Sequence, residues 1–183
     1  MDKKVELDIP HETIYREIKY PRIEFKTGNL VLILPKDFKN EDTFIKKHSD
    51  WINKKNADIQ SALKMVDQKQ LVMDRDEKEL RRMVRRTVKR FCNELNTSIN
   101  KIFFRTMKTK WGSCSSNKNL TMNTLLKYLP KNLLEYVIYH ELVHTIERKH
   151  TDRFWRLLKK KYEKHQMNEM ELLAYWFLIQ ETT

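Results

Sequence analysis

The chain has 183 residues, of which 40% are hydrophobic and 34% are charged, with a formal net charge of +12 at pH 7. This length and balance predict one globular domain spanning residues 1–183 and exclude a disordered chain. No apolar run reaches the length of a membrane span, the N-terminus lacks the features of a signal peptide, and the two cysteines suggest no disulfide framework. We therefore expect a cytoplasmic protein without a membrane partner.

The positive charge favours acidic partners such as nucleic acid or nucleotides, through long-range attraction. Charge alone is a weak guide, because a surface of this kind is more often simply solvated.

Residues 10–40 are expected to be the strand-rich N-terminal part of the domain. The segments 13–20, 22–26 and 30–35 are rich in residues that favour strands. Gly28 lies between the last two segments and predicts a hairpin turn there. We therefore expect antiparallel strands in this part of the chain.

Two long helices are predicted next, over residues 41–66 and 74–96, because apolar residues recur on one side of each. The second helix also carries two rows of bases at helical spacing, which are Arg81, Arg85 and Lys89 in one row and Arg82, Arg86 and Arg90 in the other. Such a ladder is able to follow a phosphate backbone, but it is more often a solvated outer face. No interleaved aromatic residues suggest stacking on bases.

The rest of the chain mixes strands and helices, so the predicted fold class is α+β. Strands are expected over residues 101–107 and 119–123, and the segment between them contains "WGSCS". We expect this block to shape a loop and a strand edge. Further helices are predicted over residues 131–148, 153–165 and 169–180, where Pro130 suits a first turn and Thr151 or Asp152 suits an N-cap.

The helix predicted from Pro130 carries "HELVH", a His-Glu-x-x-His motif formed by His140, Glu141 and His144. The two histidines are one turn apart, so their imidazoles point from the same face toward one place, and Glu141 lies beside them. Zinc prefers nitrogen donors near 2 Å, and a water that it activates needs a nearby base. Chance would produce about 0.02 such motifs in a chain of this composition, so the pattern strongly favours a metal site.

His150 follows His144 by six positions and is the favoured third ligand. On one uninterrupted helix its ring would not converge with the other two, so the helix must end between His144 and His150. Because no Gly or Asn occurs in this stretch, we expect Arg148 or Lys149 to adopt the left-handed conformation, at a cost of about 1–2 kcal/mol. Rival third ligands are Glu163, His165, Glu169 and Glu171.

Two blocks carry a resemblance to a known family: "TKWGSCSSNKNLTMNTLL" and "EYVIYHELVHTIERKHTDRFWRLL". Together they resemble the YgjP-like metallopeptidase family, a zincin group distantly similar to SprT-like proteins. The likeness is close over residues 109–158 and weaker in the N-terminal strands. The sequence departs from the family at Lys110, where Arg is frequent, at Lys149, where Asn is frequent, and at Thr151–Asp152, which replace a Ser-Pro pair.

The resemblance implies a zincin-like fold whose active-site helix carries the His-Glu-x-x-His motif, with residues 100–165 as the catalytic zinc-site core. It implies Zn²⁺ as the cofactor, His140, His144 and His150 as its ligands and Glu141 as the catalytic base. Cys114 is not favoured as a ligand, because it has no spaced cysteine partner.

The predicted function is therefore that of a zinc metallopeptidase, which hydrolyses a peptide or protein substrate with Glu141 as general base. Candidate donors to the oxyanion are Tyr139, Arg153, Tyr162 and His165. One alternative is a zinc-dependent nucleotide phosphohydrolase. The other is a nucleic-acid-associated SprT-like module that contacts phosphates through the ladder of Arg81, Arg82, Arg85, Arg86, Lys89 and Arg90.

Overall fold

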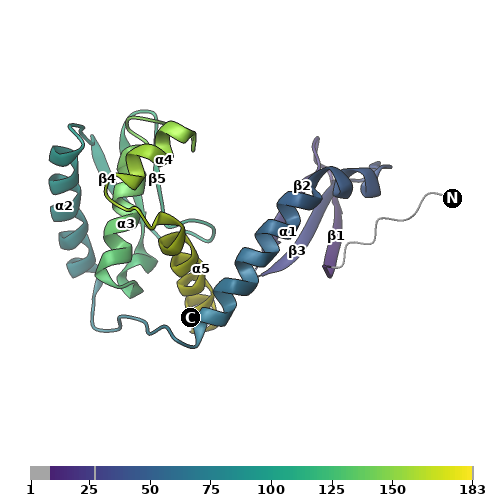
Figure 1. Cartoon of the computed structure of the whole chain (residues 1–183), viewed down its shortest axis with the longest axis horizontal. Coiled ribbons are helices and arrows are strands. Elements are labelled where there is room, and N and C mark those ends of the chain that lie inside the picture. The colour runs from purple at the N-terminus through teal and green to yellow at the C-terminus, as the bar shows by residue number, and fades with distance from the viewer. Residues whose placement is uncertain (1–8, 27, 183) are drawn as a thin grey trace. The chain divides into compact units, whose positions relative to one another are not determined.

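The structure is a computed structural model that describes residues 9–26 and 28–182. The chain divides into two compact units, Met1–Met65 and Val66–Thr183 (Figure 1). Each unit is described below by itself, and the assignment of residues 1–183 to a single domain stays a prediction.

The first unit is a three-stranded sheet followed by a long helix. The elements are β1 (His11–Arg16), β2 (Arg22–Lys26), β3 (Asn29–Pro35) and α1 (Glu41–Val66). The strand order is β1-β3-β2, and the inward-facing Leu32 and Leu34 of β3 pack with Ile45 of α1. The helix has the predicted bounds, and the Glu41 carboxylate in its first turn accepts hydrogen bonds from Thr13 and Tyr15 of β1.

The sheet of this unit is mixed, so the expectation of antiparallel strands is only partly correct. The β2–β3 hairpin is antiparallel as predicted, with Gly28 at a φ of 87° in the turn; Thr27 lies outside the described residues. However, β1 pairs with β3 in parallel. The reason is burial: β3 has an almost continuous apolar run and takes the centre, whereas the more polar β1 and β2 take the two edges.

The second unit holds a second three-stranded sheet and most of the helices. Its elements are α2 (Glu77–Glu94), β4 (Lys101–Arg105), β5 (Gly112–Cys114), β6 (Asn119–Asn123), the 3-10 helix η1 (Thr124–Tyr128), α3 (Lys131–Val143), α4 (Asp152–Lys159) and α5 (His165–Thr182). The strand order is β4-β6-β5, with β4 parallel and β5 antiparallel to β6. The described residues thus form a mixed α+β fold, as predicted, and β5 lies within the "WGSCS" block, which the sequence predicts to shape a loop and a strand edge.

The core of this unit is formed by residues of α2, β6 and α3. The helices α2 and α3 lie side by side in Figure 1. Val84 and Phe91 of α2, Leu120 of β6, and Leu134 and Ile138 of α3 are all buried in it. None of the helices in the described ranges is long and apolar enough to cross a membrane.

The end of α2 is shaped by an asparagine. Asn96 has a φ of 48°, and the next N–H, of Thr97, donates to the Cys92 carbonyl at 2.9 Å. This is the Schellman arrangement, in which a left-handed residue lets the chain leave a helix while the last carbonyls stay bonded. The chain then runs directly into β4.

Asn123, the last residue of β6, is a fully buried polar side chain that organises the neighbouring loop. Its amide nitrogen donates to the carbonyls of Met107 and Lys110, both at 2.8 Å. Its amide oxygen accepts from the N–H groups of Met107 and Leu125, at 3.2 and 3.1 Å. One side chain therefore pairs four backbone groups and fixes the loop that leads into β5.

We predict that Asn123→Ala lowers the free energy of unfolding by about 3 kcal/mol or more, because it leaves several buried backbone groups without a partner. Urea unfolding followed by circular dichroism measures the change. The exposed Asn132 provides the control, since Asn132→Ala should stay within about 0.5 kcal/mol of the wild type. Equal effects of the two substitutions would contradict this role for Asn123.

Candidate metal centre

Helix α3 carries His140 and His144 at its C-terminal end. The helix is buried along most of its length, from Leu133 to Val143, which fixes its rotation in the core. Because the two histidines are four residues apart, both rings project from the same face. Regular helix ends at Val143, and His144 is the C-cap residue, with φ −64° and ψ −14°.

The chain then leaves the helix through a tight turn. The N–H of Thr145 donates to the Leu142 carbonyl, and the N–H groups of Ile146 and Glu147 both donate to the Val143 carbonyl, each at 2.9 Å. The ring of His144 completes the turn, because its Nδ1 lies 3.1 Å from the Glu147 carbonyl oxygen.

The expectation of a left-handed residue at Arg148 or Lys149 is wrong. Among the described residues, the non-glycine positions with positive φ are Asn96 and Lys118. The turn needs no strained residue. Hydrogen bonds from residues three or four positions further along satisfy the carbonyls of Leu142 and Val143. The His144 side chain satisfies the Glu147 carbonyl beyond the helix. The predicted helix end before His150 is confirmed. Thr151 then caps α4 as predicted, by accepting a hydrogen bond from the N–H of Phe154 at 3.4 Å.

The turn brings His150 back to the other two rings. Nε2 of His140 lies 3.1 Å from Nε2 of His150, and one nitrogen from each of His140, His144 and His150 lies within 4.8 Å of the others. In a tetrahedral zinc site with bonds of 2.0–2.1 Å, two ligand nitrogens lie about 3.3 Å apart. The spacing therefore suits a divalent ion of this kind.

Two aromatic residues of α4 hold the three rings in place. The buried Phe154 ring lies 4.9, 4.6 and 4.7 Å, centre to centre, from the rings of His140, His144 and His150. The Trp155 indole stacks on His150 at 5.5 Å and also on His165 at 4.9 Å, centre to centre. Sequence reasoning did not single out either residue.

The protonation of the rings also fits a metal. A carbonyl oxygen only accepts, so Nδ1 of His144 donates to Glu147 and the ring's lone pair is on Nε2. Burial lowers the pKa of His144 to about 4, and burial also lowers the pKa of His150. Both rings are therefore neutral at pH 7, as metal ligands must be.

Glu169 of α5, one of the rival ligands, lies behind His140. Its carboxylate is 3.4 Å from Nδ1 of His140 and accepts a hydrogen bond from the Tyr136 hydroxyl at 2.5 Å. Burial alone raises the pKa of Glu169. The hydrogen bond and charge of His140, together with the hydrogen bond from the Tyr136 hydroxyl, outweigh burial and hold this pKa below its ordinary value. Glu169 thus orients His140 and leaves its Nε2 free to bind a metal.

The other rival ligands lie elsewhere. Glu171 pairs with Lys69, Glu163 is exposed, and His165 stacks on Trp155 and, within the described residues, is not part of the histidine cluster that contains His150. In the described part of the chain, the His, Cys, Asp and Glu residues that could hold a metal together are His140, His144 and His150.

Glu141 is buried beside this centre, with 8% of its surface exposed. Burial raises the pKa of Glu141 to about 7, against the opposing charges of His140 and Lys110 and a hydrogen bond from the Cys114 backbone. A Cβ atom on Gly112 would lie 2.7 Å from Cγ of Glu141, so only glycine fits at that position of β5. The "WGSCS" block therefore does form a strand edge beside the histidines, and it also fixes the carboxylate.

The four candidate oxyanion donors differ in their surroundings. Tyr139 is buried against Phe91 and Tyr162, and Tyr162 also packs on Tyr136, so the two tyrosines belong to the aromatic cluster behind α3. Arg153 is exposed in the first turn of α4. His165 is stacked on Trp155, and its buried Nδ1 has no hydrogen-bond partner among the described residues.

The sequence was also compared with known proteins. Residues 63–174, more than half of the chain, match the family model described as "YgjP-like, metallopeptidase domain". The chain belongs to the family of YgjP-like metallopeptidase domains, as its sequence motifs predicted. No curated protein matches it.

Two solved structures show partial similarity. The metallopeptidase zymogen of Methanocaldococcus jannaschii jannalysin is 29% identical, with a TM-score of 0.43, over 55% of this chain and 90% of that one. The metallopeptidase zymogen of Pyrococcus abyssi abylysin is 21% identical, with a TM-score of 0.43, over 48% of this chain and 88% of that one.

We predict that Glu169→Ala weakens zinc affinity about 10- to 100-fold, because His140 loses the partner that orients its ring. Competition with a chromophoric chelator measures the affinity. The exposed Glu163 is the matched control, and Glu163→Ala should bind zinc like the wild type. Unchanged affinity in Glu169→Ala, or loss of zinc in Glu163→Ala, would contradict the arrangement.

Proposed function

We propose that the protein is a zinc-dependent metallopeptidase in which His140, His144 and His150 bind the metal and Glu141 is the general base. The observation that carries this proposal is the convergence of three imidazoles beside a buried carboxyl group. Membership of a metallopeptidase family supports the same reaction class.

In this proposal a bound Zn²⁺ polarises the scissile carbonyl and makes a water more acidic. The chain's own residues do the rest. Glu141 takes a proton from the water on a carboxylate oxygen and returns it to the leaving amine. The close contact with Gly112 and the hydrogen bond from Cys114 restrict the positions that this carboxylate can adopt.

Strand β5 offers an edge for an extended peptide. The N–H of Asn123 bonds the Trp111 carbonyl, and the N–H of Ser115 bonds the Asn119 carbonyl. In an antiparallel pair, the backbone hydrogen-bonding groups of successive residues point alternately toward and away from the partner strand. The N–H and C=O groups of Trp111, Ser113 and Ser115 therefore point toward β6, whereas those of Gly112 point toward the open edge. We infer that a peptide substrate pairs with this edge, close to Glu141, by strand addition.

We predict that Glu141→Gln keeps zinc and lowers peptide hydrolysis about 10²-fold or more, because an amide cannot accept the proton. A fluorogenic peptide library measures hydrolysis, and elemental analysis measures zinc. Glu135→Gln, the same substitution on the same helix, should keep both properties. Retained peptide hydrolysis in Glu141→Gln would show that Glu141 is not the general base.

The same assay includes a panel of nucleoside triphosphates. The contrary result is hydrolysis of a nucleotide by the wild type without cleavage of any peptide, with this activity lost in Glu141→Gln. That result would contradict the assignment as a peptidase and support the assignment as a nucleotide phosphohydrolase.

A further inference from the structure

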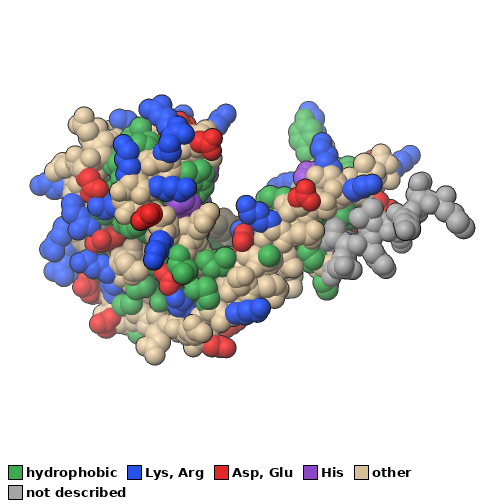
Figure 2. Space-filling model, in the orientation of Figure 1, with side chains coloured by type: hydrophobic (Ala, Val, Ile, Leu, Met, Phe, Trp, Pro, Cys, Tyr) green, Lys and Arg blue, Asp and Glu red, His purple; other side chains and the backbone are tan. Residues whose placement is uncertain are grey.

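Helix α2 concentrates positive charge. Its 18 residues include seven Lys or Arg and three Glu, and no acid lies between Arg81 and Arg90. In Figure 2, blue side chains gather over the part of the surface where Figure 1 places α2. This surface does not contain the three histidines or Glu141.

The structure divides the six cations from Arg81 to Arg90 into two groups. Arg81, Arg82 and Arg90 are compensated, because they lie 3.2, 3.9 and 3.0 Å from Glu77, Glu79 and Glu135, respectively. Arg85, Arg86 and Lys89 form no ion pair with any described residue.

Two hollows flank α2, and they differ in charge. One is lined by Arg82, Arg86, Arg90 and Lys131, but also by Glu79 and Glu135. The other, which we call the α2–β4 groove, has a volume of about 670 Å³ and contains no acid among its lining residues. Its cations are Arg85 and Lys89 from α2 and Lys101 from β4.

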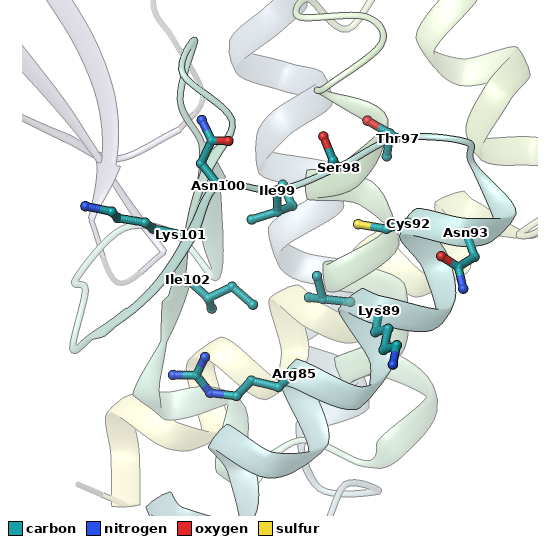
Figure 3. A pocket seen from close by; sticks show the side chains of 11 residues that line it. Arg85, Lys89, Cys92, Asn93, Thr97, Ser98, Ile99, Asn100, Lys101 and Ile102 are labelled. Atoms are coloured by element: carbon teal, nitrogen blue, oxygen red, sulfur yellow. The ribbon is translucent and has the colours of Figure 1, made fainter.

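The α2–β4 groove also offers neutral hydrogen-bonding groups. Asn93 and Ser98 are exposed on its rim, and the side chains of Cys92 and Ile102 form part of its floor (Figure 3). In the same view Arg85 extends from α2 toward β4 below Ile102, while the side chains of Lys89 and Lys101 leave α2 and β4 on the two sides of the groove and point away from each other. Arg and Lys side chains from two elements, together with Asn and Ser on the rim, are the kinds of group that contact phosphates in nucleic-acid complexes.

We propose that the α2–β4 groove binds the phosphate backbone of nucleic acid. The absence of acids from its lining and the net charge of +12 favour a polyanion. Its lining includes no aromatic residue on which a base stacks, so binding depends on phosphates and is independent of base sequence. The site lies outside the metal centre and does not require peptidase activity.

The test measures binding of a fluorescent 20-base-pair DNA duplex by anisotropy over a range of NaCl concentrations. The groove variant is Arg85→Gln/Lys89→Gln/Lys101→Gln. Each lost phosphate contact lowers the slope of log affinity against log salt by about 0.9, so the variant should lose roughly two to three units of slope. Its affinity at 0.1 M NaCl should fall at least about tenfold.

The matched control is Arg82→Gln/Arg86→Gln/Lys131→Gln, which removes the same charge from the hollow that contains Glu79 and Glu135. It should lose less than about one unit of slope. Equal losses of slope in the two variants would mean that DNA binding depends only on the net charge of the protein, and this would overturn the proposal. An absence of DNA binding by the wild type would also overturn it. Should a triple variant fail to fold, Lys89→Gln and Arg86→Gln repeat the comparison singly.

A 20-residue polyglutamate competitor separates nucleic acid from an acidic peptide. The proposal expects the DNA to bind more tightly than polyglutamate in the wild type and expects the groove variant to lose this preference. Equal affinity of the wild type for the two polyanions would overturn the assignment to nucleic acid.

Discussion

The hydrogen bond between Nδ1 of His144 and the carbonyl of Glu147 is the interaction on which the candidate metal centre depends. It does two things at once. It pairs a carbonyl beyond the end of α3, so the chain can turn there, and it leaves the lone pair of His144 on Nε2. Without this turn, the helix would carry His150 about 9 Å further along its axis than His144, and the rings would not meet.

The neighbouring residues of α3, α4 and α5 fix the positions of the three histidine rings that this turn brings together. Phe154 contacts all three rings, and Trp155 stacks on His150, so α4 positions the ring of His150, which lies beyond the end of α3. Glu169 and Tyr136 orient His140 from behind. Such polar groups are costly to bury unless each has a partner, and these contacts supply partners that also fix the orientation of the His140 ring.

The sequence predicted much of this arrangement because its strongest signals are local. Helical spacing placed His140 and His144 on one face with Glu141 beside them. The bounds of α1 followed from the helical spacing of its apolar residues, and those of β2 and β6 from runs of strand-favouring residues. The need for a helix end before His150 also followed from geometry alone.

What the sequence did not predict depends on contacts between distant segments. The parallel pairing of β1 follows from competition among three strands for the central position. Asn123 is unremarkable in sequence, yet it fixes the loop before β5 through four backbone groups. The turn after His144 was expected to need a strained residue because its solution, a side chain bonding to a carbonyl three residues ahead, leaves no pattern in the sequence. The division of the α2 cations likewise depends on Glu135 of another helix.

The central claim, that His140, His144 and His150 bind one metal, is tested most directly by zinc content and X-ray absorption of the purified protein. We predict one zinc per chain, with three imidazole nitrogens at about 2.0–2.1 Å, and loss of zinc in His150→Ala. Full zinc content with an unchanged spectrum in His150→Ala would contradict the account.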